Sequence, residues 1–219
     1  MKYIEKHRKK QPTYYTLSRS RRYDKDWRTF TDDMHAPIID SARSFLQPGQ
    51  RILDIGCGTG QILAALYQQQ PTLHLTGIDG STYMLDEARQ RIGMHARLVQ
   101  SHITQGSDIM AIVGSERFDS IVATNVLHYF ADPRDILHTL TQLLIPHGTI
   151  LLTDFIVHGW WWPLVEQAIR VIDPEHHATL ADQQLQAIVR AAQLSIDKTV
   201  PIRVNRLWQG ICIVAHKDI

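Results

Sequence analysis

Residues 51–60 read RILDIGCGTG, a short apolar run that ends in a glycine-rich turn. Apolar residues without alternation are typical of a strand that is buried on both faces of a parallel sheet. Residues 61–70, which follow the turn, have a helical pattern. A strand that passes through glycines into a helix places bare backbone N–H groups and the positive end of the helix beside a ligand. The stretch therefore predicts a nucleotide-like binding site at the end of a central strand.

The spacing of the glycines narrows the class of ligand. Gly56, Gly58 and Gly60 give G-x-G-x-G, whereas the dinucleotide fingerprint has its third glycine where this chain has Gln61. The next predicted strand ends in Asp79, about 20 residues beyond the turn, where a carboxylate can accept hydrogen bonds from both hydroxyls of a ribose. An adenosine-containing ligand without a pyrophosphate fits both observations.

Strands and helices alternate on both sides of this stretch. Pro37 stands at the favoured first position of one predicted helix, and Ser81 and Asp132 are placed to cap two others. Strands joined through helices predict right-handed crossovers and a mainly parallel sheet covered on both faces. The predicted strands are 51–55, 73–79, 96–102, 118–124 and 149–155, and the predicted helices are 37–46, 61–70, 82–92 and 133–144, with a looser segment between 103 and 117.

The end of the chain departs from this alternation. A helix is predicted over 180–193, and two strands, 195–200 and 210–216, follow it with only about ten residues between them. Parallel neighbours need a longer crossover, so these two strands are expected to pair antiparallel as a hairpin.

Composition excludes several classes of protein. The 219 residues are 44% hydrophobic and 21% charged, as in globular domains. Cys57 and Cys212 are far apart, so neither a disulfide framework nor a cysteine-rich zinc site is indicated. No apolar run approaches the roughly 20 residues of a membrane helix, and no signal core follows the N-terminal charges. We expect a cytoplasmic protein without a membrane span.

Charge is unevenly distributed along the chain. The net charge is only +1, but residues 1–22 contain eight Lys or Arg and one acid, Glu5. Such a basic arm could bind an anionic substrate, nucleic acid or a membrane surface, or it could be a solvated terminus. We expect residues 1–36 to form this arm and a segment that covers the ligand site, and residues 37–219 to form one domain.

Four segments carry a family resemblance. ILDIGCGTG (52–60), GIDGS (77–81), FDSIVATNVLHY (118–129) and LIPHG (144–148) resemble segments of the class I S-adenosylmethionine-dependent methyltransferases that act on small molecules. The closing hairpin is similar to the family's reversed seventh strand. The resemblance implies an α/β fold with a doubly wound, mainly parallel seven-stranded sheet whose last strand is reversed, the Rossmann-like methyltransferase fold.

The resemblance also implies how S-adenosylmethionine, and its product S-adenosylhomocysteine, would be held. Asp54 and the glycine turn would hold the methionine end, and Asp79 would hold the ribose. Asn125 would lie beneath the transferable methyl group. Tyr23, which precedes Asp24 in a Tyr-Asp pair, would help to close the pocket, or it is a surface tyrosine.

Adenine would be held by two further segments. Gly80 and Met84 would flank the ring, and residues 101–103 fall where the family contacts its edge, although Ser101 stands where an acid is common. The complete set of implied cofactor-binding residues is Tyr23, Asp54, Gly56, Cys57, Gly58, Thr59, Gly60, Asp79, Gly80, Met84, Ser101, His102, Ile103 and Asn125.

Methyl transfer from a sulfonium is an in-line displacement, so the protein mainly has to hold donor and acceptor close, aligned and dry. A base is needed only if the acceptor must lose a proton. The candidates for catalytic residues are His128, Asp154 and His158, which follow the predicted C-terminal ends of strands, where such sheets bind ligands. Each of them could instead have a structural role.

Residues 156–178 are expected to form an insertion like a cap. Its tryptophans, Trp160 to Trp162, could form a lid over an aromatic or apolar acceptor, pack in the core, or make a surface patch that contacts a partner or a membrane. His176 and His177 lie near Asp173 and Glu175, but no helical pair of ligands is evident, so we predict a solvated loop and no metal.

The function predicted on these grounds is methyl transfer from S-adenosylmethionine to an O, N or C atom of a small molecule. Nucleic acid is an unlikely substrate because Asn125 is not followed by Pro-Pro and an aromatic residue, the signature of methylases that act on amino groups of DNA bases. Two alternatives remain: a partner subunit that binds the cofactor without catalysis, and a nicotinamide-dependent oxidoreductase, which Gln61 disfavours.

Overall fold

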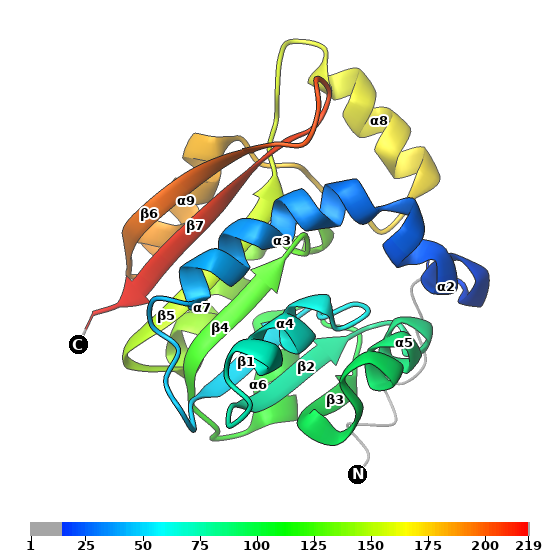
Figure 1. Ribbon diagram of the computed structural model, residues 1–219. Helices are drawn as coiled ribbons and strands as arrows, with labels where there is room; N and C mark the ends of the chain where they lie inside the picture. Colours follow the sequence, from blue (N-terminus) through cyan, green and yellow to red (C-terminus); the bar gives the residue numbers. More distant parts are fainter. Residues whose placement is uncertain (1–14, 219) are drawn as a thin grey trace.

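The computed structural model describes residues 15–218, which form an α/β fold around one seven-stranded sheet (Figure 1). The sheet order is β3-β2-β1-β4-β5-β7-β6. Neighbouring strands from β3 to β5 pair in parallel, whereas β7 is antiparallel to both β5 and β6. The predicted fold class, including the reversed last strand, is confirmed. The strands are β1 (Arg51–Ile55), β2 (His74–Asp79), β3 (Ala96–Gln100), β4 (Phe118–Thr124), β5 (Leu144–Phe155), β6 (Leu194–Arg203) and β7 (Gln209–Lys217).

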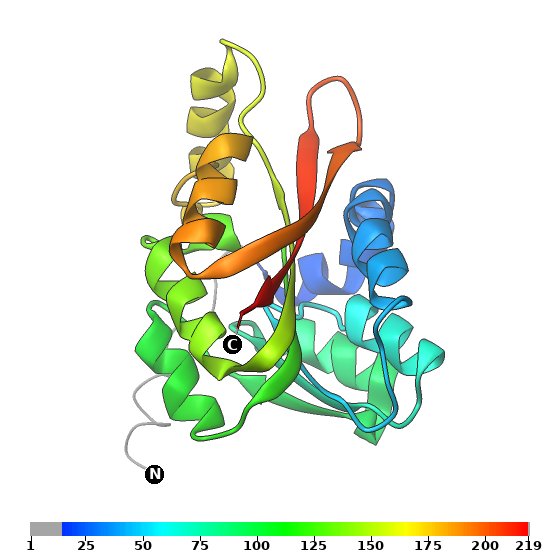
Figure 2. The ribbon, with the colours of Figure 1, turned by 90° about the vertical axis from the view of Figure 1, so that its left-hand side faces the viewer.

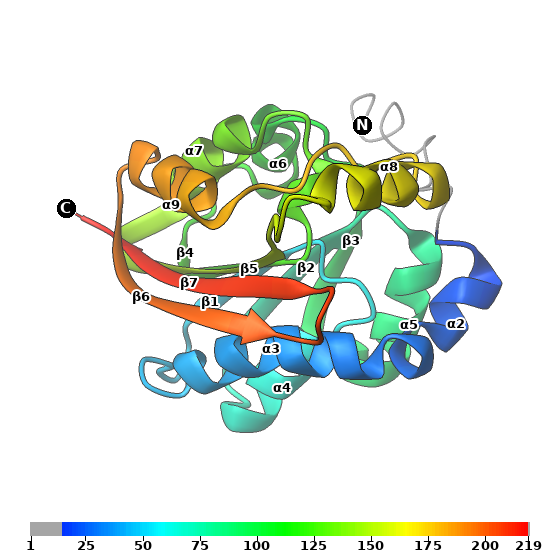
Figure 3. The same ribbon diagram turned by 90° about the horizontal axis from the view of Figure 1, so that it is seen from above.

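Helices cover both faces of the sheet, as two perpendicular views show (Figures 2 and 3). One face carries α3 (Arg28–Ala42), α4 (Gln61–Gln69) and α5 (Thr82–Ile92), and the other carries α6 (Gly106–Val113), α7 (Pro133–Leu143) and α9 (Asp182–Ala191). Two further helices, α2 (Leu17–Asp26) and α8 (Trp162–Ile172), lie beyond the carboxyl ends of the central strands.

Two apolar cores, one on each face, hold the layers together. Alternate residues of a strand point to opposite faces, so in β4 the side chain of Val122 joins one core while Ile121 joins the other. The first core includes Ile38, Leu63 and Leu85 from α3, α4 and α5, and the second includes Ile109, Leu137 and Leu185 from α6, α7 and α9.

The predicted caps are confirmed, and the predicted elements differ from the structure mainly at their ends. The Ser81 hydroxyl accepts a hydrogen bond from the Met84 N–H at 3.3 Å, and the Asp132 carboxylate accepts one from the Arg134 N–H at 3.0 Å. β5 begins five residues earlier than predicted, at Leu144, where it pairs with Phe118.

Two sequence predictions were wrong. The helix expected to begin at Pro37 begins at Arg28, so Pro37 lies inside α3 and the proposed boundary between residues 36 and 37 falls within one helix. Met34 and Ile38 are fully buried on either side of the proline, and their packing offsets the lost backbone hydrogen bond. The segment 103–117, expected to be loose, contains α6, whose first turn is held because Asp108 accepts hydrogen bonds from the Thr104 and Gln105 N–H groups.

The basic arm lies largely outside the described residues, since Lys2, Lys6, Arg8, Lys9 and Lys10 precede residue 15. Within residues 15–218, no helix has both the length and the apolar character that crossing a membrane requires.

Gly77 in β2 lets the glycine turn and α4 approach the sheet. A Cβ at this position would lie 2.7 Å from the Cys57 Sγ and 2.8 Å from the Leu63 Cδ1. We expect Gly77→Ala to lower the free energy of unfolding by about 2 kcal/mol through overpacking, as measured by urea denaturation. Adding Cys57→Ala removes one of the two clashes, so the double variant should lose less stability than the sum of the single variants. Additive losses would contradict this account of Gly77.

Candidate functional site

A pocket of about 350 Å³ opens where the carboxyl ends of β1, β2 and β4 meet. Parallel strands present their C-terminal residues at one edge of the sheet, so residues far apart in sequence converge there. We call it the ligand pocket. Its lining includes thirteen of the fourteen residues predicted to bind the cofactor: Tyr23, Asp54, Gly56, Cys57, Gly58, Thr59, Asp79, Gly80, Met84, Ser101, His102, Ile103 and Asn125.

Hydrogen bonds clamp the glycine turn to the end of β2. The N–H groups of Gly56 and Cys57 both donate to the Ile78 carbonyl, at 2.8 and 3.1 Å. The Gly58 N–H donates to the Asp79 carboxylate at 2.9 Å. Gly58 has a φ of +52°, and the space beside its missing side chain is open apart from the Met84 Cε at 3.7 Å. This space is a cradle that any side chain would fill.

Gly60 does not line the pocket. Its φ is +75°, and a Cβ there would lie 3.0 Å from the Ala88 Cβ on α5. The third glycine of the motif therefore allows the start of α4 to pack closely against α5, which a sequence motif alone does not distinguish from ligand contact.

Two carboxylates lie side by side in the ligand pocket. Asp79 accepts hydrogen bonds from the N–H groups of Gly58 and Ser81, and these bonds only partly offset burial, which raises the pKa of its carboxyl. Asp54 is only 1% exposed. Burial, with a further contribution from the Asp79 charge, raises the pKa of Asp54 well above its usual range. A cationic ligand group would relieve this penalty.

Asn125 directly follows β4 and has a left-handed conformation, with a φ of +52°. Its N–H donates to the Thr153 carbonyl at 2.8 Å, which fixes the turn against β5. Its Oδ1 is buried with no hydrogen-bond partner among the described residues, although the side chain lines the pocket. A buried acceptor without a hydrogen bond lowers stability, unless a bound ligand donates a hydrogen bond to it.

The N-terminal segment forms one wall of the pocket. Asp24 accepts hydrogen bonds from the Thr59 hydroxyl at 2.7 Å and from the Gln61 side chain at 2.6 Å, and it pairs with Arg91. Burial would raise the pKa of Asp24, but these bonds, with that from Arg91 the strongest, lower it. Tyr15 reaches the same wall through its hydroxyl, 3.0 Å from that of Tyr129.

A second chamber, of about 170 Å³, adjoins the ligand pocket. Asn125, Tyr15, Tyr23 and Tyr129 line both, so the two spaces share a wall. Its other lining residues are mainly aromatic or apolar and come from the start of α3, the segment after β4, the end of β5, α8 with the segment after it, and the β6–β7 turn. They are Trp27, Phe30, His128, Phe155, Ile169, Ile172, Asp173, His176 and Trp208.

His128 and Asp154 form a buried pair beside this chamber, 6% and 4% exposed. The His128 Nδ1 lies 2.7 Å from one carboxylate oxygen of Asp154. The same carboxylate accepts hydrogen bonds from the N–H groups of His128 and Phe155, at 3.2 and 2.9 Å. The Asp154 carboxylate therefore faces the Nδ1 side of the His128 ring, and the Nε2 nitrogen is the one that Asp154 does not contact.

His158, the third predicted catalytic residue, lines neither space. Its Nε2 lies 3.2 Å from the Gln209 side-chain nitrogen, and its ring packs against Trp161. It joins the start of the insertion to β7.

The three tryptophans have three different environments and none of them lines the pocket or the chamber. Trp162 is 3% exposed and packs edge to face on Trp208. Trp160 is 90% exposed. The insertion faces the chamber instead through Ile169 and Ile172 of α8 and through Asp173 and His176 after it.

The segment around His176 is not the solvated loop that the sequence predicted. His176 is 4% exposed and its Nε2 lies 2.8 Å from the Glu166 carboxylate, while Asp173 accepts a hydrogen bond from the Tyr129 hydroxyl at 2.6 Å. Across residues 15–218, no cluster of three or more His, Cys, Asp or Glu side chains is arranged to hold a metal ion.

Several lining residues have no signal in the sequence. Tyr15, His35 and Gln61 line the ligand pocket, as do Glu175 and His177 from the insertion. Gln61 directly follows the glycine turn, whereas the others reach the pocket only because the N-terminal segment, α3 and the segment after α8 fold over the end of the sheet (Figure 1). Tyr129 was within reach of sequence reasoning, since it directly follows His128.

Known proteins resemble the chain in sequence and in fold. A family model described as a methyltransferase domain matches residues 53–150. Malonyl-[acyl-carrier protein] O-methyltransferase of Haemophilus ducreyi is 28% identical over 179 residues, which are 77% of this chain and 67% of that protein. Trans-aconitate 2-methyltransferase of Escherichia coli is 32% identical over 122 residues, 55% of this chain and 46% of that protein.

Among solved structures, magnesium protoporphyrin IX methyltransferase of Synechocystis PCC 6803, which contains bound SAH, is similar with a TM-score of 0.63. It is 17% identical, and the match covers 85% of this chain and 86% of that one. The likeness is one of fold. The chain spans about half to two thirds of the length of the curated relatives it matches.

His35 makes folding depend on pH. Burial lowers the pKa of its imidazole to about 4, and the Gln61 side chain only partly opposes this. Below its ordinary pKa the unfolded chain binds more protons than the folded one, so stability falls as the pH drops from about 6.5 toward about 4. We expect wild type to lose about 1–2 kcal/mol more than His35→Gln over this window, as measured by urea denaturation. His74→Gln, at the exposed start of β2, is the control, and parallel curves for wild type and His35→Gln would contradict the assignment.

Proposed function

Because the chain belongs to the class I S-adenosylmethionine-dependent methyltransferases, we propose that it transfers a methyl group from this cofactor to a hydroxyl oxygen of a small molecule. The observation that carries the proposal is the ligand pocket with the second chamber beside it, sharing Asn125. The ligand pocket suits the methyl donor, and the second chamber suits the methyl acceptor.

The residues of the ligand pocket fit the cofactor. The cradle at Gly58 admits a ligand close to the backbone, and Asp79 keeps free lone pairs for ribose hydroxyls after accepting its two N–H bonds. Asp54 suits the cationic amino group of the methionine end. Met84 and residues 101–103 would hold adenine, and Asn125, whose Oδ1 is buried without a partner among the described residues, would lie beside the methyl group.

When bound, S-adenosylmethionine supplies an electrophilic methyl group on a sulfonium. The chain's part is to align the acceptor with it and exclude water. The aromatic walls of the second chamber, among them Phe30, Phe155 and Trp208, suit a compact apolar or aromatic acceptor.

His128 lines the acceptor chamber, and its Nε2, the nitrogen that Asp154 does not contact, can take the proton of an acceptor hydroxyl. The imidazolium that forms stays paired with Asp154. Asp154 acts through His128 and is a positioning residue. The pair favours an O–H acceptor, because an amine acceptor can react without a base held in this way.

The cofactor assignment is tested by titration calorimetry with S-adenosylmethionine and S-adenosylhomocysteine. Asp79→Ala removes the carboxylate that holds the glycine turn and the ribose, and we expect affinity to fall about 100-fold. Asp119→Ala is the matched control, because Asp119 accepts the Arg51 N–H at 2.8 Å at the opposite edge of the sheet. Equal affinities for the two variants would refute the site, and binding of a nicotinamide dinucleotide in place of the cofactor would revive the oxidoreductase alternative.

The role of His128 is tested with small phenols as acceptors. We expect His128→Gln to lower kcat about 100-fold or more without changing the Kd for S-adenosylmethionine, because His128 does not line the ligand pocket. The remaining rate should rise with pH as the acceptor ionises by itself. His158→Gln should retain wild-type kcat. Tight cofactor binding without product from any acceptor would favour the non-catalytic partner subunit.

A further inference from the structure

Large apolar side chains are exposed together at one end of the molecule. The start of α8 and the turn between β6 and β7 lie at the same end of the molecule (Figure 1), and Trp162 on α8 contacts Trp208 beside that turn. We call this the α8 surface. It comprises Trp160, Leu164, Val171, Ile172 and Leu207, whose exposed fractions are 90%, 70%, 78%, 61% and 59%.

The helix α8 is apolar on two faces. Leu164, Ala168 and Val171 follow the i, i+4, i+7 spacing of one helical face, and all three are exposed. The opposite face carries Trp162, which is buried, and Ile169, which lines the second chamber. This outer face also carries Gln167, but its three apolar side chains are exposed together, and an exposed apolar stripe marks a contact surface.

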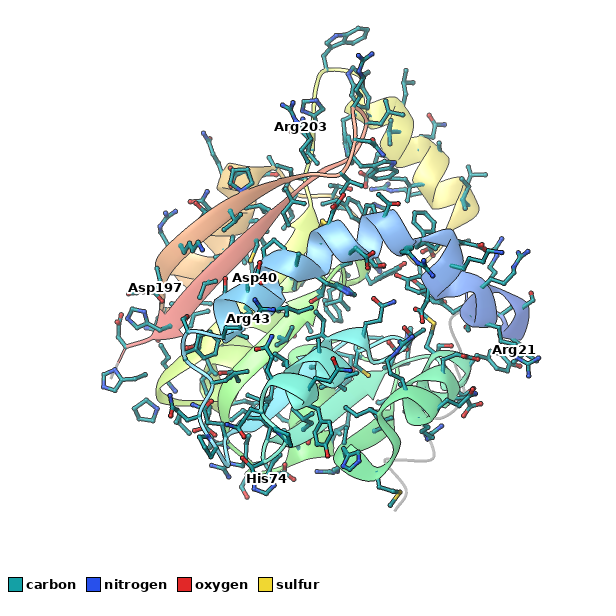
Figure 4. All side chains as sticks on the ribbon, in the orientation of Figure 1. Arg21, Asp40, Arg43, His74, Asp197 and Arg203 are labelled. Carbon is teal, nitrogen blue, oxygen red and sulfur yellow. The ribbon has the colours of Figure 1, made fainter. Side chains whose placement is uncertain are left out.

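The charges around the α8 surface are positive. Segments 156–172 and 200–209 contain Arg170, Arg203 and Arg206, all exposed, and Figure 4 shows Arg203 at this end of the molecule. Their one acid, Glu166, accepts hydrogen bonds from the Trp162 indole and the Thr179 N–H and also pairs with Arg170 at 3.6 Å, so the positive charge that remains is that of Arg203 and Arg206. The occupant should therefore be both apolar and anionic.

We propose that the α8 surface docks on the anionic face of a phospholipid bilayer. A projecting tryptophan with Leu, Val and Ile beside arginines is the combination that favours the boundary between headgroups and acyl chains. The contact is peripheral, with the side chains of α8 and of the β6–β7 turn entering the boundary and the arginines meeting lipid phosphates.

The α8 surface is continuous with the second chamber. Ile172 is 61% exposed and also lines that chamber, so one side chain belongs to both. On the proposed function, an apolar acceptor dissolved in the bilayer would reach the chamber along α8. Docking itself does not depend on methyl transfer.

The test is cosedimentation of the full chain with phosphatidylcholine vesicles that do or do not contain phosphatidylglycerol. We expect binding to the anionic vesicles that weakens as salt is raised. The triple variant Trp160→Gln/Leu164→Gln/Leu207→Gln should bind about tenfold more weakly or worse. Met94→Gln, which replaces a 98% exposed apolar residue after α5, is the matched control and should bind as wild type.

Charge reversal tests the electrostatic contribution to vesicle binding separately from the apolar contribution. Arg203→Glu should weaken binding to anionic vesicles about tenfold, whereas Arg43→Glu, at the end of α3 and far from Arg203 in Figure 4, should not. Circular dichroism and the Kd for S-adenosylmethionine check that each variant is folded, since none of these residues lines the ligand pocket.

Three results would overturn the proposal. The first is that wild type does not bind anionic vesicles, and the second is that the triple variant binds them as well as Met94→Gln does. The third is a dimer in light scattering that the triple variant abolishes, because the α8 surface would then be a contact between copies of the chain. Vesicle binding without methyl transfer would leave docking standing and defeat only the proposed function.

Discussion

The site depends on the hydrogen bond from the Gly58 N–H to the Asp79 carboxylate, which joins the turn after β1 to the end of β2. The two strands are adjacent in the sheet, so the bond requires that nothing stands between the turn and β2. Gly77 meets that requirement because it has no side chain to displace Cys57 or Leu63. The clamp leaves the backbone of the turn facing the pocket and holds a carboxylate at a fixed distance from it.

The ligand pocket contains two buried carboxylates, and a cationic ligand would offset the free-energy cost of burying their negative charge. Asp54 and Asp79 are close enough for the charge of one to raise the pKa of the other, and burial raises both. In the second chamber the balance is different. Asp154 accepts hydrogen bonds from the backbone N–H groups of His128 and Phe155 and lies 2.7 Å from the His128 ring, so its carboxylate is directed to His128 rather than to a ligand. One space is suited to binding a cation, and the other is suited to removing a proton.

The helix α8 connects the chemistry to the surface. Its inner face closes the chamber, and Glu166 holds that face in place through Trp162, Thr179 and His176. Its outer face has no corresponding partner within residues 15–218. An insertion that only closed the chamber would need one apolar face, and α8 has two.

Sequence alone determined the sheet, the glycine turn and the position of Asp79, because strand and helix periods, caps and turn glycines are encoded over a few neighbouring residues. Thirteen of the fourteen residues that it proposed for cofactor binding lie on the wall of one pocket, since the ends of parallel strands converge at one edge. Tertiary structure decided the rest. The His128–Asp154 pair joins residues 26 apart, and the Tyr15–Tyr129 contact joins residues 114 apart. Packing also decides that His158 lines neither space, that Gly60 packs against α5 instead of lining the pocket, and that Trp160 is exposed while Trp162 is buried. These facts depend on which segments pack together, and no local sequence pattern encodes that.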